Sequence, residues 1–234
     1  MHKVLSKNIS DDDKQLTTFL NLYSYMIARK KRDVLKEFNI LIDGIILVWL
    51  LRIFGFSRVS RFSFDMTSMA PIVFKEAIKK NQQIYFIGSK PNVIDNAITN
   101  IKSEFSGLNI CGFNHGYLSI NERISVFKEI IALKVDIVIC GMGTPLQEEF
   151  LLELKQYGWE GKGYTCGGFL HQTAADIKYY PKWVDKYNLR GFYRMYDEPY
   201  LLKRYFLVYP WALLHYLVDS YSYNIEKRRN RKGV

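Results

Sequence analysis

Asp43 is the acidic residue whose surroundings most suggest chemistry. It stands with Gly44 inside the apolar segment 40–47, where an isolated ionised carboxylate is costly to bury. Partial burial would make this carboxylate a better acceptor for a hydroxyl proton near neutral pH. The same two residues also fit a plain Asp-Gly turn between strands, and the pattern alone favours that interpretation slightly.

A second candidate site is the segment 141–150, which follows an apolar strand expected at 135–140 and contains the start of a helix. Its glycines let the backbone turn sharply and approach a ligand closely. The first amides of the helix and the positive end of its dipole then favour an anion such as a phosphate. The residues concerned are Gly141, Gly143, Thr144, Pro145 and Gln147.

A structural role competes with ligand binding in this segment. Thr144 can cap the helix and Pro145 suits its first position, while Thr144-x-x-Gln147 also fits a capping box. The spacing gives capping and ligand contact equal support. We expect Glu148 and Glu149 to be solvated or paired with the helix dipole rather than catalytic.

Two further side chains have the chemistry to contact a ligand. Arg61 presents a planar fork that matches a diphosphate, although most such arginines are surface charges. Tyr117 lies just past a strand expected at 108–113, at the same sheet edge as segment 141–150. It could stack on a base or contact a phosphate, although a packed loop tyrosine is the commoner outcome.

The sequence argues against metal and cofactor chemistry. The four histidines are scattered without a His-x-x-x-His spacing, and an Asp-x-Asp spacing occurs only in the acidic run 11–13 of the loose N-terminal lead-in. A Walker loop is absent, and Gly141-x-Gly143 does not complete the dinucleotide fingerprint. We therefore predict metal-independent chemistry without a cofactor, which disfavours kinases and dehydrogenases.

The elements around these residues alternate in a βαβ rhythm. We expect strands at 84–87, 108–113, 135–140 and 162–166, with helices at 93–105, after an N-cap at Asn121, and from the 141–150 segment through residue 156. Helical spacing at 15–30 predicts another helix. The pattern indicates an α/β, Rossmann-like core with a mostly parallel sheet flanked by helices.

Length and composition fit one domain with a terminal appendage. The chain has 234 residues, and its longest apolar runs, 45–51 and 206–218, fall short of the roughly 20 residues of a membrane-spanning helix. The cysteines Cys111, Cys140 and Cys166 sit at or near the ends of apolar runs, without a C-x-x-C pair or a signal peptide. They indicate reduced core residues in a cytosolic protein.

Charge points to an anionic partner. Lys and Arg number 33 against 23 Asp and Glu, for a formal charge of +10. Past Gly167 and Gly168 the alternation gives way to a basic, aromatic tail that ends in the basic run 227–232, a composition that suits a membrane-surface helix. We expect a core at 1–188 and a helical appendage at 189–234 that docks on an anionic membrane.

Taken in order, the motifs resemble those of the TagA/WecG/CpsF glycosyltransferases of bacterial surface polysaccharide synthesis, over about residues 19–205. The Gly-x-Pro-x-Gln-Glu element is the specific part, and the others gain force from their order. The matching residues are Asn21, Asp43, Gly44, Arg61, Gly116, Tyr117, Gly143, Pro145, Gln147, Glu148, Gly167, Gly168, Glu198 and Pro199.

This resemblance implies an inverting enzyme that moves a sugar from a UDP-sugar to a saccharide on polyprenyl diphosphate. The enzyme would be peripheral on the inner face of the cytoplasmic membrane, and its oligomeric state, a homo-oligomer included, stays open. By the match, Asp43 is the base that deprotonates the acceptor hydroxyl, while Arg61 and Gln147 hold the diphosphate or the sugar. The remaining candidate substrate contacts are Asn21, Tyr117, Gly141, Gly143, Thr144 and the tail residue Arg194.

Several positions depart from the family pattern. Phe19 stands where many members have threonine, and Ser63 stands near an expected glycine. The segment 179–181 replaces Arg-Ala-Pro, and 190–191 replaces a Glu-Trp pair. These departures leave open whether the sugar is N-acetylmannosamine, its uronic acid, glucose or glucuronic acid.

Two other classes of function compete. A nucleic-acid-binding protein would explain the charge and the tail but not Asp43 or the segment 143–148. A scaffold that binds a nucleotide sugar without turnover would explain the departures, but retention of Asp43, Arg61 and Gln147 argues against it. We favour the transferase and expect no nucleic-acid partner.

Overall fold

The computed structural model describes residues 1–9, 14–56, 58–177, 184, 193 and 204–231. Within them, strands pair in parallel throughout one sheet, in the order β2-β1-β6-β5-β3-β4. The strands are β1 (Leu16–Leu20), β2 (Phe38–Ile42), β3 (Gln83–Gly88), β4 (Asn109–Asn114), β5 (Ile137–Gly141) and β6 (Lys162–Thr165). The predicted Rossmann-like α/β core is confirmed.

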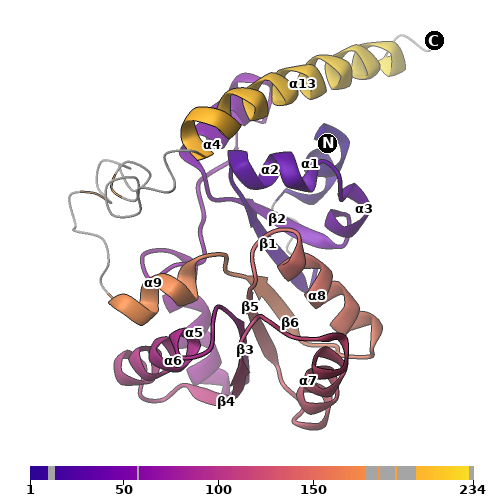
Figure 1. The fold of residues 1–234 in the computed structure, drawn as a ribbon. Coiled ribbons are helices and arrows are strands. Elements are labelled where there is room, and N and C mark those ends of the chain that lie inside the picture. Colours follow the sequence, from indigo (N-terminus) through magenta and orange to yellow (C-terminus); the bar gives the residue numbers. More distant parts are fainter. Residues whose placement is uncertain (10–13, 57, 178–183, 185–192, 194–203, 232–234) are drawn as a thin grey trace.

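Helices cover both faces of the sheet, as parallel strands joined by crossovers require (Figure 1). On one face pack α5 (Met69–Lys80), α6 (Val93–Glu104) and α9 (Phe169–Ala175). On the other pack α7 (Ile120–Ala132) and α8 (Leu146–Gln156). The same core cluster also holds residues of α1 (His2–Asn8), α2 (Leu22–Ala28), α3 (Arg32–Leu35), α4 (Ile45–Ile53) and α13 (Tyr209–Arg231).

The helix predicted at 15–30 is wrong in its first part, because residues 16–20 form β1, the second strand from one edge of the sheet. Every residue of β1 is buried, since the strand is covered on both faces. Leu16 and Leu20 pack into one core and Phe19 into the other. A strand buried on both sides places apolar residues at spacings that also fit a helix. The helix begins at Leu22.

Two helix starts also differ from expectation. Helix α7 is capped by Ser119, which shares a capping box with Glu122, and not by Asn121. Helix α8 begins at Leu146, after a cis Thr144–Pro145 bond, and no side chain caps it. The capping box between Thr144 and Gln147, one of the two alternatives that the spacing left open, is therefore wrong.

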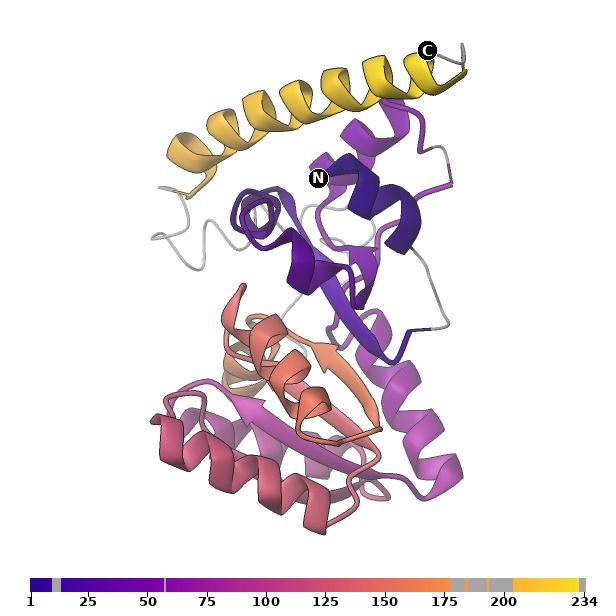
Figure 2. The same cartoon turned by 90° about the vertical axis from the view of Figure 1, so that its right-hand side faces the viewer.

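The C-terminal helix α13 crosses the top of the molecule beside α2 and α4 (Figures 1 and 2). A short π-helix, Arg204–Val208, leads into it. The expected boundary of the appendage at residue 189 lies outside the described residues. Aromatic contacts hold α13 in place, because the ring of Tyr216 lies 4.8 Å from His2, 5.5 Å from Tyr25 and 5.7 Å from Phe54.

An ion pair also joins α13 to α2. The Asp219 carboxylate accepts from Arg29 Nε at 2.6 Å and Nη2 at 2.9 Å, and from the Tyr25 hydroxyl at 2.6 Å. Burial alone would raise the pKa of Asp219, but the hydrogen bonds from Arg29 and Tyr25 outweigh it and lower that pKa to about 2. The folded state therefore favours the ionised carboxylate.

We expect Asp219→Asn to lower the free energy of unfolding at pH 7 by about 2–3 kcal/mol, because it leaves the Arg29 charge without its counterion. The Arg29 side chain keeps 20% exposure, which reduces the cost below that of a fully buried pair. Urea denaturation with Asp33→Asn as an exposed control measures the effect. The native chain loses this stability as the pH falls from 3.8, the ordinary pKa of an aspartate, toward 2. The difference in unfolding free energy between the native chain and the variant should therefore narrow over this range. A gap that is constant over this range would contradict the ion pair.

Candidate active site

The candidate site begins at the carboxyl ends of β1 and β2, where Asn21 and Asp43 follow their strands. The Asp43 amide donates to the Leu20 carbonyl at 2.9 Å, and a Cβ on Gly44 would lie 3.1 Å from the Asn21 Cβ. The structure thus brings Asn21 and Asp43 together. Asp43 and Gly44 join a strand to helix α4, so the alternative of a turn between strands is wrong.

Asn21 also begins helix α2. Its Oδ1 accepts from the Ser24 amide at 2.9 Å, and the Ser24 hydroxyl accepts from the Asn21 amide at 2.8 Å. This capping box fixes where the chain turns from β1 into α2. A contact between Asn21 and a ligand stays a prediction.

Arg61 lies directly against Asp43. A bridge pairs residue 61 with Ile42, so the backbone extends the edge of the sheet. The guanidinium donates from Nε to the Asp43 carbonyl at 2.8 Å, and its Nη2 lies 3.5 Å from Asp43 Oδ1. The cation stabilises the ionised carboxylate, which is the form that accepts a proton. The Asp43 side chain keeps 35% exposure, so it is accessible from solvent.

Glycines pack the ends of β3 and β5 closely together. A Cβ on Gly88 would lie 2.4 Å from the Gly141 carbonyl oxygen, and one on Gly116 would lie 3.1 Å from the Gly88 Cα. A Cβ on Gly141 would meet the Cys166 sulfur at 2.9 Å. Packing therefore explains Gly141 without a ligand. Gly88, which the sequence analysis did not single out, belongs to the same contact.

Gly143 is different, because a Cβ there would meet no atom within 4 Å. Its φ of 78° lies in the left-handed region that glycine adopts without strain. The residue therefore turns the chain beside open space just before α8, where an anion cradle was predicted. A ligand contact at Gly143 stays a prediction.

Gln147 links the loops that follow β5 and β6. Its Oε1 accepts from the Gly167 amide at 3.2 Å, and its Nε2 donates to the Thr144 hydroxyl at 3.3 Å. The residue is 3% exposed. Gln147 thus connects the loop before α8 with the loop after β6. Its contact with a diphosphate or sugar stays a prediction.

Tyr117 lies on the side of segment 141–150 and not beside Asp43. It is 68% exposed and follows Gly116, where a Cβ would lie 3.1 Å from the Gly88 Cα and 3.2 Å from the Met142 side chain. Arg194 lies outside the described residues. Both stay predictions as substrate contacts.

Comparison with known proteins decides the family. The family model described as Glycosyl transferase WecG/TagA/CpsF family matches residues 1–225. The chain belongs to this glycosyltransferase family.

Curated relatives of this WecG/TagA/CpsF chain carry related activities in their names. A UDP-Gal:alpha-D-GlcNAc-diphosphoundecaprenol beta-1,4-galactosyltransferase of Shigella boydii is 36% identical, over 89% of this chain and 90% of the relative. An N-acetylglucosaminyldiphosphoundecaprenol N-acetyl-beta-D-mannosaminyltransferase of Bacillus subtilis (strain 168) is 31% identical, over 77% and 70%. These two relatives transfer different sugars, so family membership does not fix the donor.

Glu148 of this family member is buried, and the expectation that it is solvated is wrong. It is 1% exposed, and its Oε1 accepts from the Thr18 hydroxyl at 2.7 Å, the Thr144 hydroxyl at 3.1 Å and Gln147 Nε2 at 3.2 Å. Its Oε2 has no hydrogen-bond partner among the described residues. Burial raises the pKa of Glu148, against the lowering by these hydrogen bonds.

A signal for this burial exists in the sequence. Gln147 and Glu148 stand three residues before the buried Phe150 and Leu151, so both extend the core-facing stripe of α8. Glu149 turns outward and pairs with Lys31 at 2.8 Å. At the start of α8, Gln147 thus connects two loops, Glu148 is buried, and Glu149 forms an ion pair at the surface.

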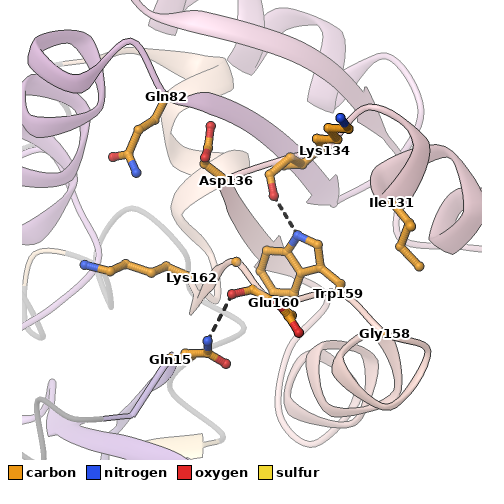
Figure 3. A pocket seen from close by; sticks show the side chains of 11 residues that line it. Gln15, Gln82, Ile131, Lys134, Asp136, Gly158, Trp159, Glu160 and Lys162 are labelled. Atoms are coloured by element: carbon orange, nitrogen blue, oxygen red, sulfur yellow. Dashed lines mark hydrogen bonds between the residues drawn. The ribbon is translucent and has the colours of Figure 1, made fainter.

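A cavity formed by described residues of this family member lies elsewhere. It holds about 520 Å³ and is lined by residues that include Gln15, Asp136, Trp159 and Lys162 (Figure 3). These lie at the amino ends of the strands, whereas open parallel sheets bind ligands at the carboxyl ends. Trp159 Nε1 donates to the Val135 carbonyl at 2.7 Å, which fixes the indole ring in the wall of this cavity. Among the described residues, no three His, Cys, Asp or Glu side chains gather as a metal site.

We expect Glu148→Gln to raise the free energy of unfolding at neutral pH, because the amide keeps an acceptor oxygen but cannot ionise. The folded-state pKa of Glu148 lies above the ordinary 4.5, so the native chain loses stability as the pH rises from the lower value to the higher. The variant should gain up to about 1.4 kcal/mol per pH unit in that window.

Urea denaturation between about pH 4 and pH 8 measures this difference, with exposed Glu104→Gln as the control. The native chain and Glu148→Gln should be equally stable near pH 4 and diverge above it. A variant that becomes less stable than the native chain as the pH rises would show that the ionised form of Glu148 stabilises the network.

Proposed function

We propose that this chain is an inverting glycosyltransferase that moves a sugar from a UDP-sugar to a saccharide linked to polyprenyl diphosphate. The observation that carries the proposal is the Asp43–Arg61 pair, which lies beside Asn21 at the carboxyl edge of the sheet in a member of this family. Relatives whose names specify a diphosphoundecaprenol acceptor support the acceptor class.

In the proposed reaction Asp43 takes the proton from the acceptor hydroxyl. The oxygen then attacks the anomeric carbon from the side opposite UDP, so the C–O bond forms as the bond to UDP breaks and the centre inverts. Arg61 contributes in two ways, because it orients the Asp43 carboxylate and places a cation near the developing diphosphate charge.

The loop before α8 is proposed to receive the diphosphate. The first amides of this helix and the open space beside Gly143 favour an anion. Acidic residues at the helix start would oppose this, but Lys31 neutralises Glu149 and burial favours the neutral form of Glu148. We propose that these groups stabilise the leaving UDP without a metal ion.

The C-terminal helix is proposed to dock on an anionic membrane. An outer stripe of α13 is exposed at 40–71% and repeats at helical spacing, whereas Ala212 and Tyr216 are buried on the inner side. Its residues are Trp211, Leu214, Leu217, Val218 and Tyr221. Exposed Arg228 and Arg229 follow at the end of α13. None of the helices in the described ranges is long and apolar enough to pass through a bilayer.

The donor is the finer point to establish. Because the Shigella boydii relative is named for UDP-Gal and the Bacillus subtilis relative for a mannosaminyl group, UDP-galactose and UDP-N-acetylmannosamine are the first donors to compare. Release of UDP in the presence of N-acetylglucosaminyl-diphosphoundecaprenol tests the function directly. No transfer from any UDP-sugar to such an acceptor would overturn the proposal.

With the best donor of that comparison, Asp43→Asn should lower kcat by at least about 100-fold, because the amide cannot accept the proton. UDP affinity, measured by titration calorimetry, should stay within twofold. Asp33→Asn, at a side chain that is 93% exposed, is the matched control. Undiminished turnover by Asp43→Asn would rule out this residue as the base.

Chelation tests the metal-free mechanism separately. We expect excess EDTA to leave the rate of sugar transfer unchanged, because the proposed stabilisation of UDP comes from Arg61 and backbone amides. The rate is measured with and without added Mg²⁺ after chelation and desalting. A loss of activity that Mg²⁺ restores would contradict this mechanism.

A further inference from the structure

Helix α4 is apolar on every side, yet it is half exposed. Its sequence, Ile45 to Ile53, contains a single charged residue, Arg52. Leu47, Val48 and Leu51 are buried at 0–1% exposure. A helix that is hydrophobic all round normally lies inside a protein core or in a membrane. The outer face of α4 therefore calls for a second apolar environment.

The outer face is defined by large side chains at helical spacing. Ile46 is 38% exposed, Trp49 is 56% exposed and Ile53 is 75% exposed. They stand at positions i, i+3 and i+7, so they share one face of the helix. Tryptophan with aliphatic neighbours is typical of helices that lie at the interface of a bilayer.

Charge around this face identifies the partner. Between Asp43 and Asp65 the sequence has three arginines, Arg52, Arg58 and Arg61, and no acidic residue. Both Arg52 and Arg58 are exposed. Basic residues beside an exposed apolar face complement the negative surface of an anionic bilayer.

The position of α4 connects this face with the candidate site. Gly44, next to Asp43, is the N-cap of α4, and Phe54 at its other end contacts Tyr216 of α13 at 5.7 Å. Figures 1 and 2 show α4 beside α13. Nine residues extend about 13 Å. The exposed face thus begins within one turn of the proposed base.

We propose that α4 is a membrane-docking element in its own right, which inserts Ile46, Trp49 and Ile53 into an anionic bilayer next to Asp43. This inference rests on the proposed function, because it gives the lipid-linked acceptor a route to the base. Besides the membrane contact proposed for α13, α4 would provide a second one, which belongs to the α/β core and lies next to the proposed base.

The test is the double variant Trp49→Ser with Ile53→Ser in the full chain. The matched control is Ile72→Ser with Ile120→Ser, which removes similarly exposed apolar side chains (57% and 80%) from α5 and α7. Co-sedimentation with vesicles of phosphatidylglycerol and phosphatidylcholine should fall at least about tenfold for the α4 variant relative to the control. Circular dichroism and the melting temperature establish that both variants fold.

Two acceptors separate docking from catalysis. Transfer to an undecaprenyl-linked acceptor in vesicles should fall together with binding, while transfer to a water-soluble, short-chain analogue should stay within twofold of the native chain. Vesicle binding equal to that of the control would overturn the inference. The inference would also be overturned if the native chain formed a dimer and the α4 substitutions dissociated it, because a second copy of the chain would then cover this face. If the native chain transfers sugar to neither acceptor, the proposed function fails, whereas vesicle binding still decides the role of α4.

Discussion

Parallel pairing of β1 is the constraint on which the candidate site depends. Because β1 pairs with β2 on one side and β6 on the other, the residues after three strands emerge at one edge. Asn21, Asp43 and Gly167 are those residues. The pairing with β6 covers only two residues in register, and hydrogen bonds of Thr165 with Thr18 and with the Phe19 amide continue it toward the edge. These side chains thus complete the sheet beneath the site.

The same hydrogen-bond network reaches the third loop of the site. Thr18 donates to Glu148, which also accepts from Thr144 and Gln147, and Gln147 in turn accepts from the Gly167 amide. All three contacts are made to Oε1, and burial raises the pKa of Glu148. The network therefore fixes the start of α8, while burial opposes a full negative charge at Glu148 under the proposed diphosphate position.

The sequence predicts the second half of this fold better than the first. From β3 to β6, each apolar strand alternates with an amphipathic helix and a turn, so local pattern and topology agree. Before β3 the pattern misleads, because β1 is buried on both faces and mimics helical spacing. The apolar run from residue 38 to 53 also hides a change from strand to helix at Asp43. Local periodicity cannot show that β1 and β2 join the sheet beyond β6, since this pairing depends on contacts distant in sequence.

The candidate residues likewise divide into those that the sequence indicates and those whose role depends on tertiary contacts. Asp43 and Arg61 were singled out by residue type, and the sheet brings them into contact. The burial of Glu148 and the close packing of Gly88 against Gly141 arise from tertiary contacts that no single motif specifies. Gln147 illustrates why a motif and a role differ. Its position in the family element is recognisable, but its hydrogen bonds to Thr144 and Gly167 appear only once the loops meet.

The site residues that follow β1 and β2 each precede a helix whose far end is tied to α13. Helix α2 follows Asn21, and its C-cap residue Arg29 pairs with Asp219. Helix α4 follows Asp43 and Gly44, and its C-cap residue Phe54 packs on Tyr216. Seven and nine residues correspond to about 10 and 13 Å of helix. Both connections reach α13 within one turn, at Tyr216 and Asp219, so they fix the height of this part of α13 above the carboxyl edge. With α13 on a bilayer, they would hold the proposed base at a fixed depth relative to the head groups. A lipid diphosphate is confined to that same depth, so the fold would align the acceptor with Asp43 before the donor binds.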